Sequence, residues 1–221
     1  MQNNERKRAN WKNWSHEKYN ENTYSNALYG NPVGTGQNNC YAYAINHYVN
    51  KGDSKLQPGD LSGYTGPIDL SSCKDLVQRV KDDAKAMGWT LSVVNQNTEC
   101  PKGAVKIASV IAPNVDFHWY KFHKHVMYKV KTPRSVADLA KEFGVSQSNI
   151  HNPNISQTLQ PGDIVLIRNA NCWSHKQGFS PDGPILKDSC GNVIKDPATA
   201  CRSYGRGLDY KQMCTVYCLQ K

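Results

Sequence analysis

Two short aromatic segments, Asp116-Phe117-His118-Trp119-Tyr120 and Cys172-Trp173-Ser174-His175-Lys176, decide how this chain is expected to fold. Each carries a histidine, and aromatic residues at alternating positions are typical of β-strands. If residues 124–171 were removed, the two segments would form a simple β-hairpin, with His118 near Ser174 or His175. The sequence therefore predicts an antiparallel sheet with a unit inserted between two neighbouring strands.

The rest of the chain predicts few helices and several strands. Apolar residues at helical spacing predict helices over residues 39–49 and 72–87, the second capped by Ser71 or Ser72 and stopped by Gly88. Strands are expected over residues 90–95, 104–111 and 117–122, and residues 1–36 read as an extended lead-in. A cysteine-bearing helix followed by a histidine-bearing antiparallel sheet is an α+β arrangement.

The inserted unit has its own β-α-α-β pattern. Met127-Tyr128-Lys129-Val130 predicts a strand, and Val136, Leu139, Ala140 and Phe143 recur at helical spacing before a stop at Gly144. Ser146 would cap a second short helix, and Ile164-Val165-Leu166-Ile167 would close the unit as a strand. We expect residues 126–168 to form a module within a discontinuous domain made of residues 1–125 and 169–221.

This module resembles a LysM domain. The resemblance rests on the Tyr-x-Val strand, the segment Val136–Val145, the corner Asn152-Pro153-Asn154 and the segment Leu159-Gln160-Pro161-Gly162-Asp163. It implies weak binding of polymers that contain N-acetylglucosamine, such as peptidoglycan or chitin, in a shallow groove. By position, the residues of that groove would be Thr132, Pro133, Arg134, Ser135, Asn154, Ile155, Ser156 and Gln157. Pro133-Arg134-Ser135-Val136 stands where the family often has Gly-Asp-Thr-Leu. The alternative is an insert without a ligand.

Cys40 is the candidate nucleophile. It follows a glycine-rich loop at the start of a predicted helix, where unpaired N–H groups stabilise a thiolate. His118 would be the general base and acid, and His175 would orient it, with Asp188 or Asn192 as alternative orienting residues. Gln37 or Asn38 could donate to the oxyanion. A structural or disulfide-bonded cysteine is the competing interpretation of Cys40.

The order Cys…His…His on a helix and a hairpin resembles papain-like enzymes, and NlpC-type cell-wall peptidases in particular. The residues that carry this resemblance are Asn39-Cys40-Tyr41-Ala42, Phe117-His118-Trp119 and Ser174-His175-Lys176. They share the family's order but not its flanking residues. The resemblance implies amide hydrolysis of a peptide through an acyl-enzyme, without a cofactor. A metal site made by His118, His123 and His125 with Asp116 is a weaker alternative. His123 and His125 lie at the junction to the insert and are expected to be exposed.

Cysteine content and charge bear on location and partners. The chain has 221 residues, eight cysteines and a net charge of +9 spread along its length. Cysteines without C-x-x-C spacing favour disulfides in an oxidising compartment, for example three bridges plus one buried thiol besides Cys40. The charge suits either a solvated surface or an anionic wall polymer, and no nucleic-acid motif stands out.

The amino-terminal residues Met1–Arg8 lack an apolar segment behind them, so they do not read as a signal peptide. No run approaches the roughly 20 apolar residues of a membrane span. We therefore expect a secreted cysteine hydrolase whose leader is absent from this chain and whose LysM-like insert directs it to a glycan. The alternatives are a non-enzymatic glycan-binding wall or matrix protein, and a toxin or effector that acts on a cell wall.

Overall fold

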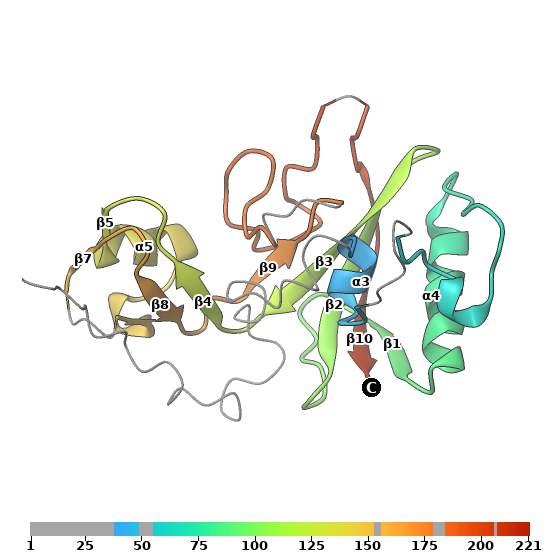
Figure 1. Ribbon diagram of the computed structural model, residues 1–221, viewed down its shortest axis with the longest axis horizontal. Coiled ribbons are helices and arrows are strands. Elements are labelled where there is room, and N and C mark those ends of the chain that lie inside the picture. The colour runs from blue at the N-terminus through green and yellow to red at the C-terminus, as the bar shows by residue number, and fades with distance from the viewer. Residues whose placement is uncertain (1–37, 49–54, 153–155, 179–183, 206) are drawn as a thin grey trace, which may run out of the picture.

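The computed structural model describes residues 38–48, 55–152, 156–178, 184–205 and 207–221. Its centre is an antiparallel five-stranded sheet in the order β1-β10-β2-β3-β9 (Figure 1). The strands are β1 (Thr90–Val94), β2 (Val105–Ala112), β3 (Asp116–His123), β9 (Cys172–His175) and β10 (Gln212–Gln220). The mixed α/β arrangement with few helices and antiparallel sheets is confirmed.

Two helices pack on one face of this sheet. Helix α4 (Cys73–Ala86) matches the predicted helix, begins after the cap Ser72 and buries Leu76, Val80 and Ala84. Helix α3 (Cys40–Ala44) is shorter than predicted. It ends early because Asn46 adopts a left-handed backbone conformation with φ of 52°, which no α-helix continues through. All five residues of α3 are buried, so this short element belongs to the core.

The carboxylate of Asp83 joins the helical layer together. It accepts hydrogen bonds from Tyr41 Oη (2.8 Å), Gly59 N (2.7 Å) and both the backbone N (2.9 Å) and Oγ (2.8 Å) of Ser62. Ser62 is the last residue of the short 3₁₀ helix η2 (Asp60–Ser62), and Asp83 itself lies in α4. One buried side chain of α4 therefore fixes the position of α3, the helix that carries Cys40.

Residues between β3 and β9 build a second lobe, on the left in Figure 1. Its elements are β4 (Val126–Lys129), β5 (Arg134–Ser135), α5 (Val136–Phe143), η3 (Gln147–Asn149), β6 (Ile150–His151), β7 (Thr158–Leu159) and β8 (Ile164–Ile167). The strands form a sheet β4-β8-β6 and a pair β5-β7. The predicted second helix is only a 3₁₀ turn, because Ile150 is already extended and pairs with Ile167.

Helix α5 follows the sequence pattern closely. Ser135 caps its start by accepting from Asp138 N, and Gly144 ends it with φ of 59°. Its buried stripe of Val136, Leu139 and Phe143 packs against the β4-β8-β6 sheet. The same apolar cluster continues past the predicted end of the insert to Cys172 and Leu186, so the lobe shares its core with the rest of the chain.

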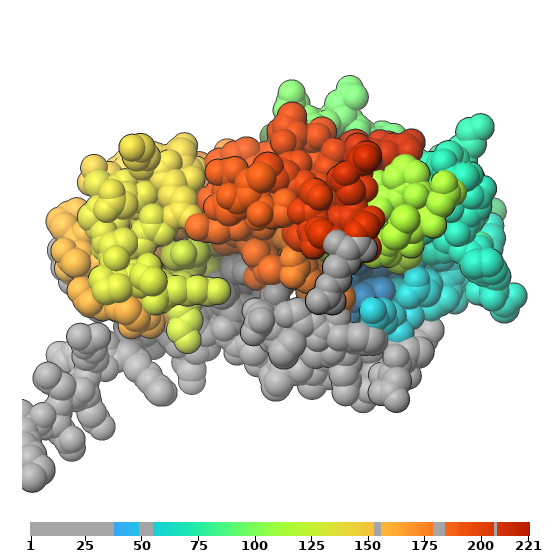
Figure 2. Space-filling model, turned by 90° about the horizontal axis from the view of Figure 1, so that it is seen from above, coloured from blue at the N-terminus to red at the C-terminus, as the bar shows by residue number. Residues whose placement is uncertain are grey.

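The two strands that flank this lobe, β3 and β9, pair with each other as in the predicted hairpin. Tyr120 pairs with His175 and His123 with Cys172, as expected from the two aromatic segments. The lobe also contacts the segment after β9, coloured orange beside the yellow lobe in Figure 2. Lys195 Nζ donates to the carbonyls of Phe143 (2.5 Å) and Ala170 (2.6 Å). The lobe is thus anchored at several points beyond its two chain connections.

Three disulfides link Cys73 to Cys214, Cys100 to Cys218 and Cys190 to Cys201, while Cys40 and Cys172 are free and buried. Three bridges with one further buried thiol besides Cys40 is the arrangement that the sequence offered as one solution. Two of the bridges hold β10, which lies between β1 and β2 in the sheet, to α4 and to the loop after β1. Such bridges are compatible with an extracellular protein. None of the helices in the described ranges has the length and apolar character of a membrane span.

Candidate functional site

His118 and His175 form a direct pair in the buried part of the sheet. His118 Nε2 lies 2.8 Å from His175 Nδ1, and His175 Nε2 lies 3.0 Å from the carbonyl oxygen of Lys187. Because a carbonyl only accepts, His175 Nε2 carries the proton and its Nδ1 is an acceptor in the neutral ring. His118 Nε2 therefore donates to His175. Nδ1 of His118 is left with its lone pair, as a general base requires.

Both imidazoles rest in their neutral form. Burial lowers the pKa of His118 well below its usual range, and the neighbouring His175 lowers it further. Burial also lowers the pKa of His175, although the Lys187 carbonyl and the charge of Asp188 oppose this. The hydrogen bonds from His118 to His175 and from His175 to the Lys187 carbonyl each use the one N–H group of a neutral imidazole. They are therefore consistent with two neutral rings.

Aromatic rings enclose the pair on the face of β3 that points away from α3. The ring of His118 packs edge-on against Tyr120, with centroids 5.4 Å apart, and lies 5.3 Å from the ring of Tyr210. Tyr210 donates from its hydroxyl to Asp116 Oδ2 at 2.8 Å. Asp116, His118 and Tyr120 thus share one face of the strand, because successive side chains of a strand point to opposite faces.

Cys40 lies at the start of α3 and contacts β3 from its edge. Asn39 caps the helix by accepting from Ala42 N at 3.1 Å, and its Nδ2 donates to the Leu56 carbonyl at 2.8 Å. The backbone groups of Trp119 and Tyr41 act on the thiol and lower its pKa. Trp119 directly follows His118 in β3. The structure brings His118 and His175 into direct contact, and it places Cys40 on the helix that packs against the same strand.

The thiol is not poised as a thiolate in the resting protein. Burial raises the pKa of Cys40 to about 12, and the charge of Asp116 raises it further. The two backbone groups and the charge of Lys176 oppose these effects without overcoming them. The expected stabilisation at a helix start is outweighed, because a five-residue helix offers little dipole and the side chain is only 6% exposed.

The thiol and the His118 ring approach β3 from different directions. The side chain of Trp119 faces α3, where its ring lies 5.1 Å from that of Tyr41, so His118 faces the opposite layer. β9 pairs with residues 120–123 of β3, and the backbone edge of residues 116–119 lies beyond its end. The Trp119 backbone, which acts on the Cys40 thiol, belongs to this stretch. A dyad between Cys40 and His118 would therefore form around the strand edge.

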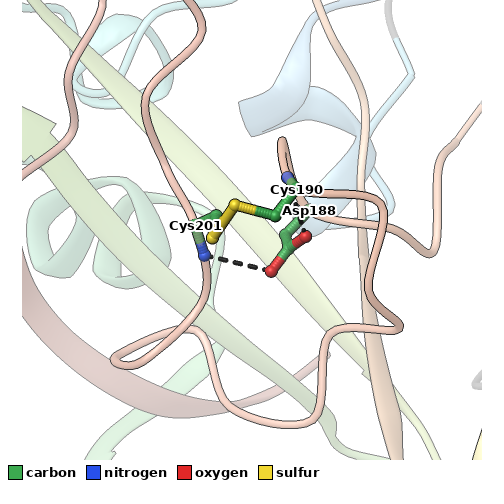
Figure 3. Close-up of side chains that lie close together, drawn as sticks. All are labelled: Asp188, Cys190 and Cys201. Atoms are coloured by element: carbon green, nitrogen blue, oxygen red, sulfur yellow. Dashed lines mark hydrogen bonds between the residues drawn. A yellow bond between two sulfur atoms is a disulfide. The ribbon is translucent and has the colours of Figure 1, made fainter.

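The alternative orienting residues have other roles. Figure 3 shows Asp188 beside the Cys190–Cys201 disulfide, with its carboxylate turned toward backbone N–H groups. Asp188 Oδ1 accepts from the backbone N of Cys190 (3.0 Å) and Asn192 (2.9 Å), and Oδ2 accepts from Cys201 N (3.0 Å). These three groups come close enough to suggest a metal site, but the two sulfurs are bonded to each other and are not free to act as ligands.

A second polar cluster, which the sequence did not indicate, lies on the α3 face. Ser174 Oγ is 2.6 Å from His123 Nε2 and 2.5 Å from Tyr43 Oη, and all three side chains are buried. The prediction that His123 is exposed is wrong, because its side chain points inward beside α3. His118 points to the other face, so these histidines do not gather as the alternative metal site required. His125 is only partly buried.

The two predicted groove segments lie side by side in the second lobe. Residues Arg134 and Ser135 pair with Leu159 and Thr158, and Val136 N donates to the carbonyl of Gln157 at 2.9 Å. Arg134 forms an ion pair with Glu142, and Ser135 caps α5, so both side chains are already engaged. Thr132, Pro133, Ser156 and Gln157 are exposed. Asn154 and Ile155 lie outside the described residues.

The oxyanion candidates are only half described. Asn38 is buried directly before the cap of α3, and Gln37 lies outside the described residues. Searches of protein-family models, curated proteins and solved structures find no match to this chain. Function therefore has to be argued from the geometry of these residues.

Proposed function

We propose that the protein is a cysteine hydrolase of papain-like, NlpC-like type that cleaves an amide bond in a cell-wall or glycan-linked peptide. The observation that carries the proposal is the hydrogen-bond chain from His118 to His175 to the Lys187 carbonyl. These hydrogen bonds leave His118 Nδ1 as the proton acceptor. His118 lies on the strand whose backbone, at Trp119, acts on the Cys40 thiol. A cysteine, a base and an orienting group in this order are the parts of a nucleophilic triad.

The residues would act in a fixed order. Cys40 transfers its proton to His118 Nδ1 as its sulfur attacks the substrate carbonyl, and the imidazolium keeps its Nε2 hydrogen bond to His175. N–H groups at the start of α3, with Asn38 or Gln37, would hold the oxyanion. His118 then protonates the leaving amine, and water hydrolyses the thioester. Since the thiol and His118 are both neutral at rest, the thiolate forms only during this reaction.

The second lobe would direct the enzyme to its substrate. Its resemblance to a LysM domain suggests a polymer that contains N-acetylglucosamine, and the β5-β7 pair joins the two segments expected to contact it. Exposed polar groups at Thr132, Ser156 and Gln157 suit hydroxyl and acetamide recognition. A shallow groove of this size gives weak affinity for a single module.

The test of hydrolysis uses the two free thiols as a matched pair. Cys40→Ala should abolish release of new amino groups from peptidoglycan fragments, whereas Cys172→Ala should leave that release unchanged. His175→Ala should lower kcat more than it raises KM, because the substrate does not touch this residue. Undiminished hydrolysis by Cys40→Ala would contradict the proposed enzyme.

Glycan binding is tested with point variants, because deleting residues 126–168 would uncover Cys172 and Leu186. Thr132→Ala combined with Gln157→Ala should weaken cosedimentation with chitin or peptidoglycan several-fold. Lys129→Ala, on β4, removes a positive charge and should have little effect. If Lys129→Ala weakens binding equally, the basic surface and not the groove attracts the polymer.

A non-enzymatic glycan-binding protein is the second candidate. The burial of Cys40 and the high pKa of its thiol favour this function, because an inert structural thiol has these properties. Under this alternative, Cys40→Ala changes neither peptide cleavage nor cosedimentation.

A further inference from the structure

Lys176 carries a buried charge that the proposed mechanism does not use. It directly follows β9 and is only 1% exposed. Its Nζ donates to the carbonyl of Gly178 at 2.6 Å, and within the described ranges no carboxylate lies within ion-pair distance of it. A buried ammonium group without a counter-charge is costly, so a negative charge that forms nearby would be strongly favoured.

Lys176 lies where the pairing of β3 with β9 ends, and its charge acts on the Cys40 thiol. The pairing ends at His175 opposite Tyr120, and Lys176 directly follows it. The backbone of Trp119, which precedes Tyr120, and the charge of Lys176 both lower the pKa of the Cys40 thiol. The backbone of His175 bonds Ile185 on its other side, so the neighbouring positions point toward β3. Ser174, two residues before Lys176, contacts Tyr43 of α3, so this end of β9 lies beside the helix that carries Cys40.

We propose that Lys176 is a positioning residue whose fixed positive charge stabilises the thiolate of Cys40 when His118 removes its proton. Among the described residues, the charged and titratable groups that face the thiol are Asp116 in β3, Tyr210 before β10, and Lys176 after β9. Among these side chains Lys176 alone favours the anion. Lys55 in turn faces Lys176 and opposes its charge.

The ammonium form of Lys176 persists at neutral pH. Burial lowers the pKa of Lys176 to about 8, Cys40 opposes this shift, and Lys55 adds to it. Below that pH most molecules carry the charge. The inference rests on the proposed function for its purpose, but the charge acts on the thiol whether or not a substrate is cleaved.

The test measures how fast iodoacetamide alkylates Cys40 at pH 7, in full-length protein with Cys172→Ala so that Cys40 is its one free thiol. Mass spectrometry gives the rate, which is proportional to the thiolate fraction below the thiol pKa. Lys176→Gln removes the charge but keeps a donor for the Gly178 carbonyl. Lys176→Met removes both, and Lys176→Arg keeps the charge. Lys195→Met, at a lysine that bonds other carbonyls, is the control.

We expect the Gln and Met variants to react about tenfold more slowly or worse, since one pKa unit is a tenfold change. Lys176→Arg should stay within about threefold of the parent, because the charge is retained. Should the Met variant fail to fold, the Gln and Arg variants decide. A parental rate in Lys176→Gln overturns the inference, as does a Cys40 that resists alkylation in the parent. Lysine-dependent alkylation without hydrolysis would refute the proposed function alone.

Discussion

At the scale of single residues, buried polar groups with several hydrogen-bond partners contribute strongly to the stability of this protein. Asp83 accepts four hydrogen bonds from three residues that lie far from it in sequence. Loss of its carboxylate would leave buried donors without partners, and each such group costs about 1–3 kcal/mol. Asp83 should therefore matter much more to stability than its neighbours in α4.

Asp83→Ala should lower the free energy of unfolding by about 3 kcal/mol or more, as measured by urea denaturation. Asp82→Ala is the matched control. Asp82 accepts from Tyr64 and Gln78 at exposed positions, so its loss should cost less than about 0.5 kcal/mol. Equal stability of the two variants would show that the four hydrogen bonds are not important.

The buried histidine pair makes stability depend on pH. Burial lowers the folded-state pKa of His118 and His175, while an unfolded histidine titrates near about 6.5. Below that pH the unfolded chain binds more protons than the folded protein. The contribution of the neutral histidines to the free energy of unfolding is therefore complete above about pH 6.5 and is lost as the pH decreases. Each histidine contributes up to about 1.4 kcal/mol per pH unit, until the pH reaches its folded-state pKa.

This dependence can be measured as the urea midpoint between about pH 7.5 and pH 5.5. His118→Phe removes one of the two titrating groups and should flatten the decline. A slope unchanged by the substitution would mean that other groups, such as surface carboxylates, are responsible.

At the scale of elements, α3 has only five residues, and hydrogen bonds from its side chains to other elements hold it in place. Tyr43 connects it to Ser174 in β9 and, through Ser174, to His123 in β3. The position of Cys40 relative to β3 and β9 depends on this connection.

Tyr43→Phe should lower the free energy of unfolding by about 1 kcal/mol, the contribution of a typical buried hydrogen bond. Ser174 and His123 would still bond each other, so the loss should stay modest. Tyr128→Phe, which also removes a tyrosine hydroxyl, should cost almost nothing, because that hydroxyl has no partner among the described residues. Chemical denaturation of both variants gives the comparison.

Sequence patterns predicted the elements better than their lengths and surroundings. The limits of α4 and α5 followed from periodicity, capping serines and, for α5, Gly144, because these are local effects. The early end of α3 depends on the left-handed backbone of Asn46, which periodicity does not reveal. Alternation along β3 could have placed His123 on the Trp119 side, facing α3, and so warned against treating it as exposed.

The candidate site was predictable only as far as the hairpin determined it. The approach of His118 to His175 followed from joining two aromatic segments across the insert. The tautomer did not, because it depends on the Lys187 carbonyl, brought into place by the bridge between His175 and Ile185. The strand order of the sheet could not be predicted either, because β10 lies between β1 and β2 although it is distant from both in sequence.

At the scale of the whole molecule, the disulfides differ in how much chain they close. Cys73–Cys214 spans 141 residues and Cys100–Cys218 spans 118, whereas Cys190–Cys201 spans 11. In the chain-entropy view, the long loops are worth roughly 5 kcal/mol each and the short one roughly 3 kcal/mol. The paired substitution of Cys73 and Cys214 by alanine should therefore lower thermal stability more than that of Cys190 and Cys201. Calorimetry of the two double variants tests the order, and the reverse order would contradict it.

The position of β10 between β1 and β2 also affects how the chain folds during synthesis. β1 and β2 each pair with β10, so the sheet on their side stays open until residues 212–220 have emerged. Until then Cys73 and Cys100 await their partners Cys214 and Cys218, and either can form a wrong bridge with whichever thiol appears first. Cys190 and Cys201 emerge earlier and pair locally. Oxidative folding of this protein should thus be limited by disulfide rearrangement once the last strand is in place, which makes it a natural client of a disulfide isomerase.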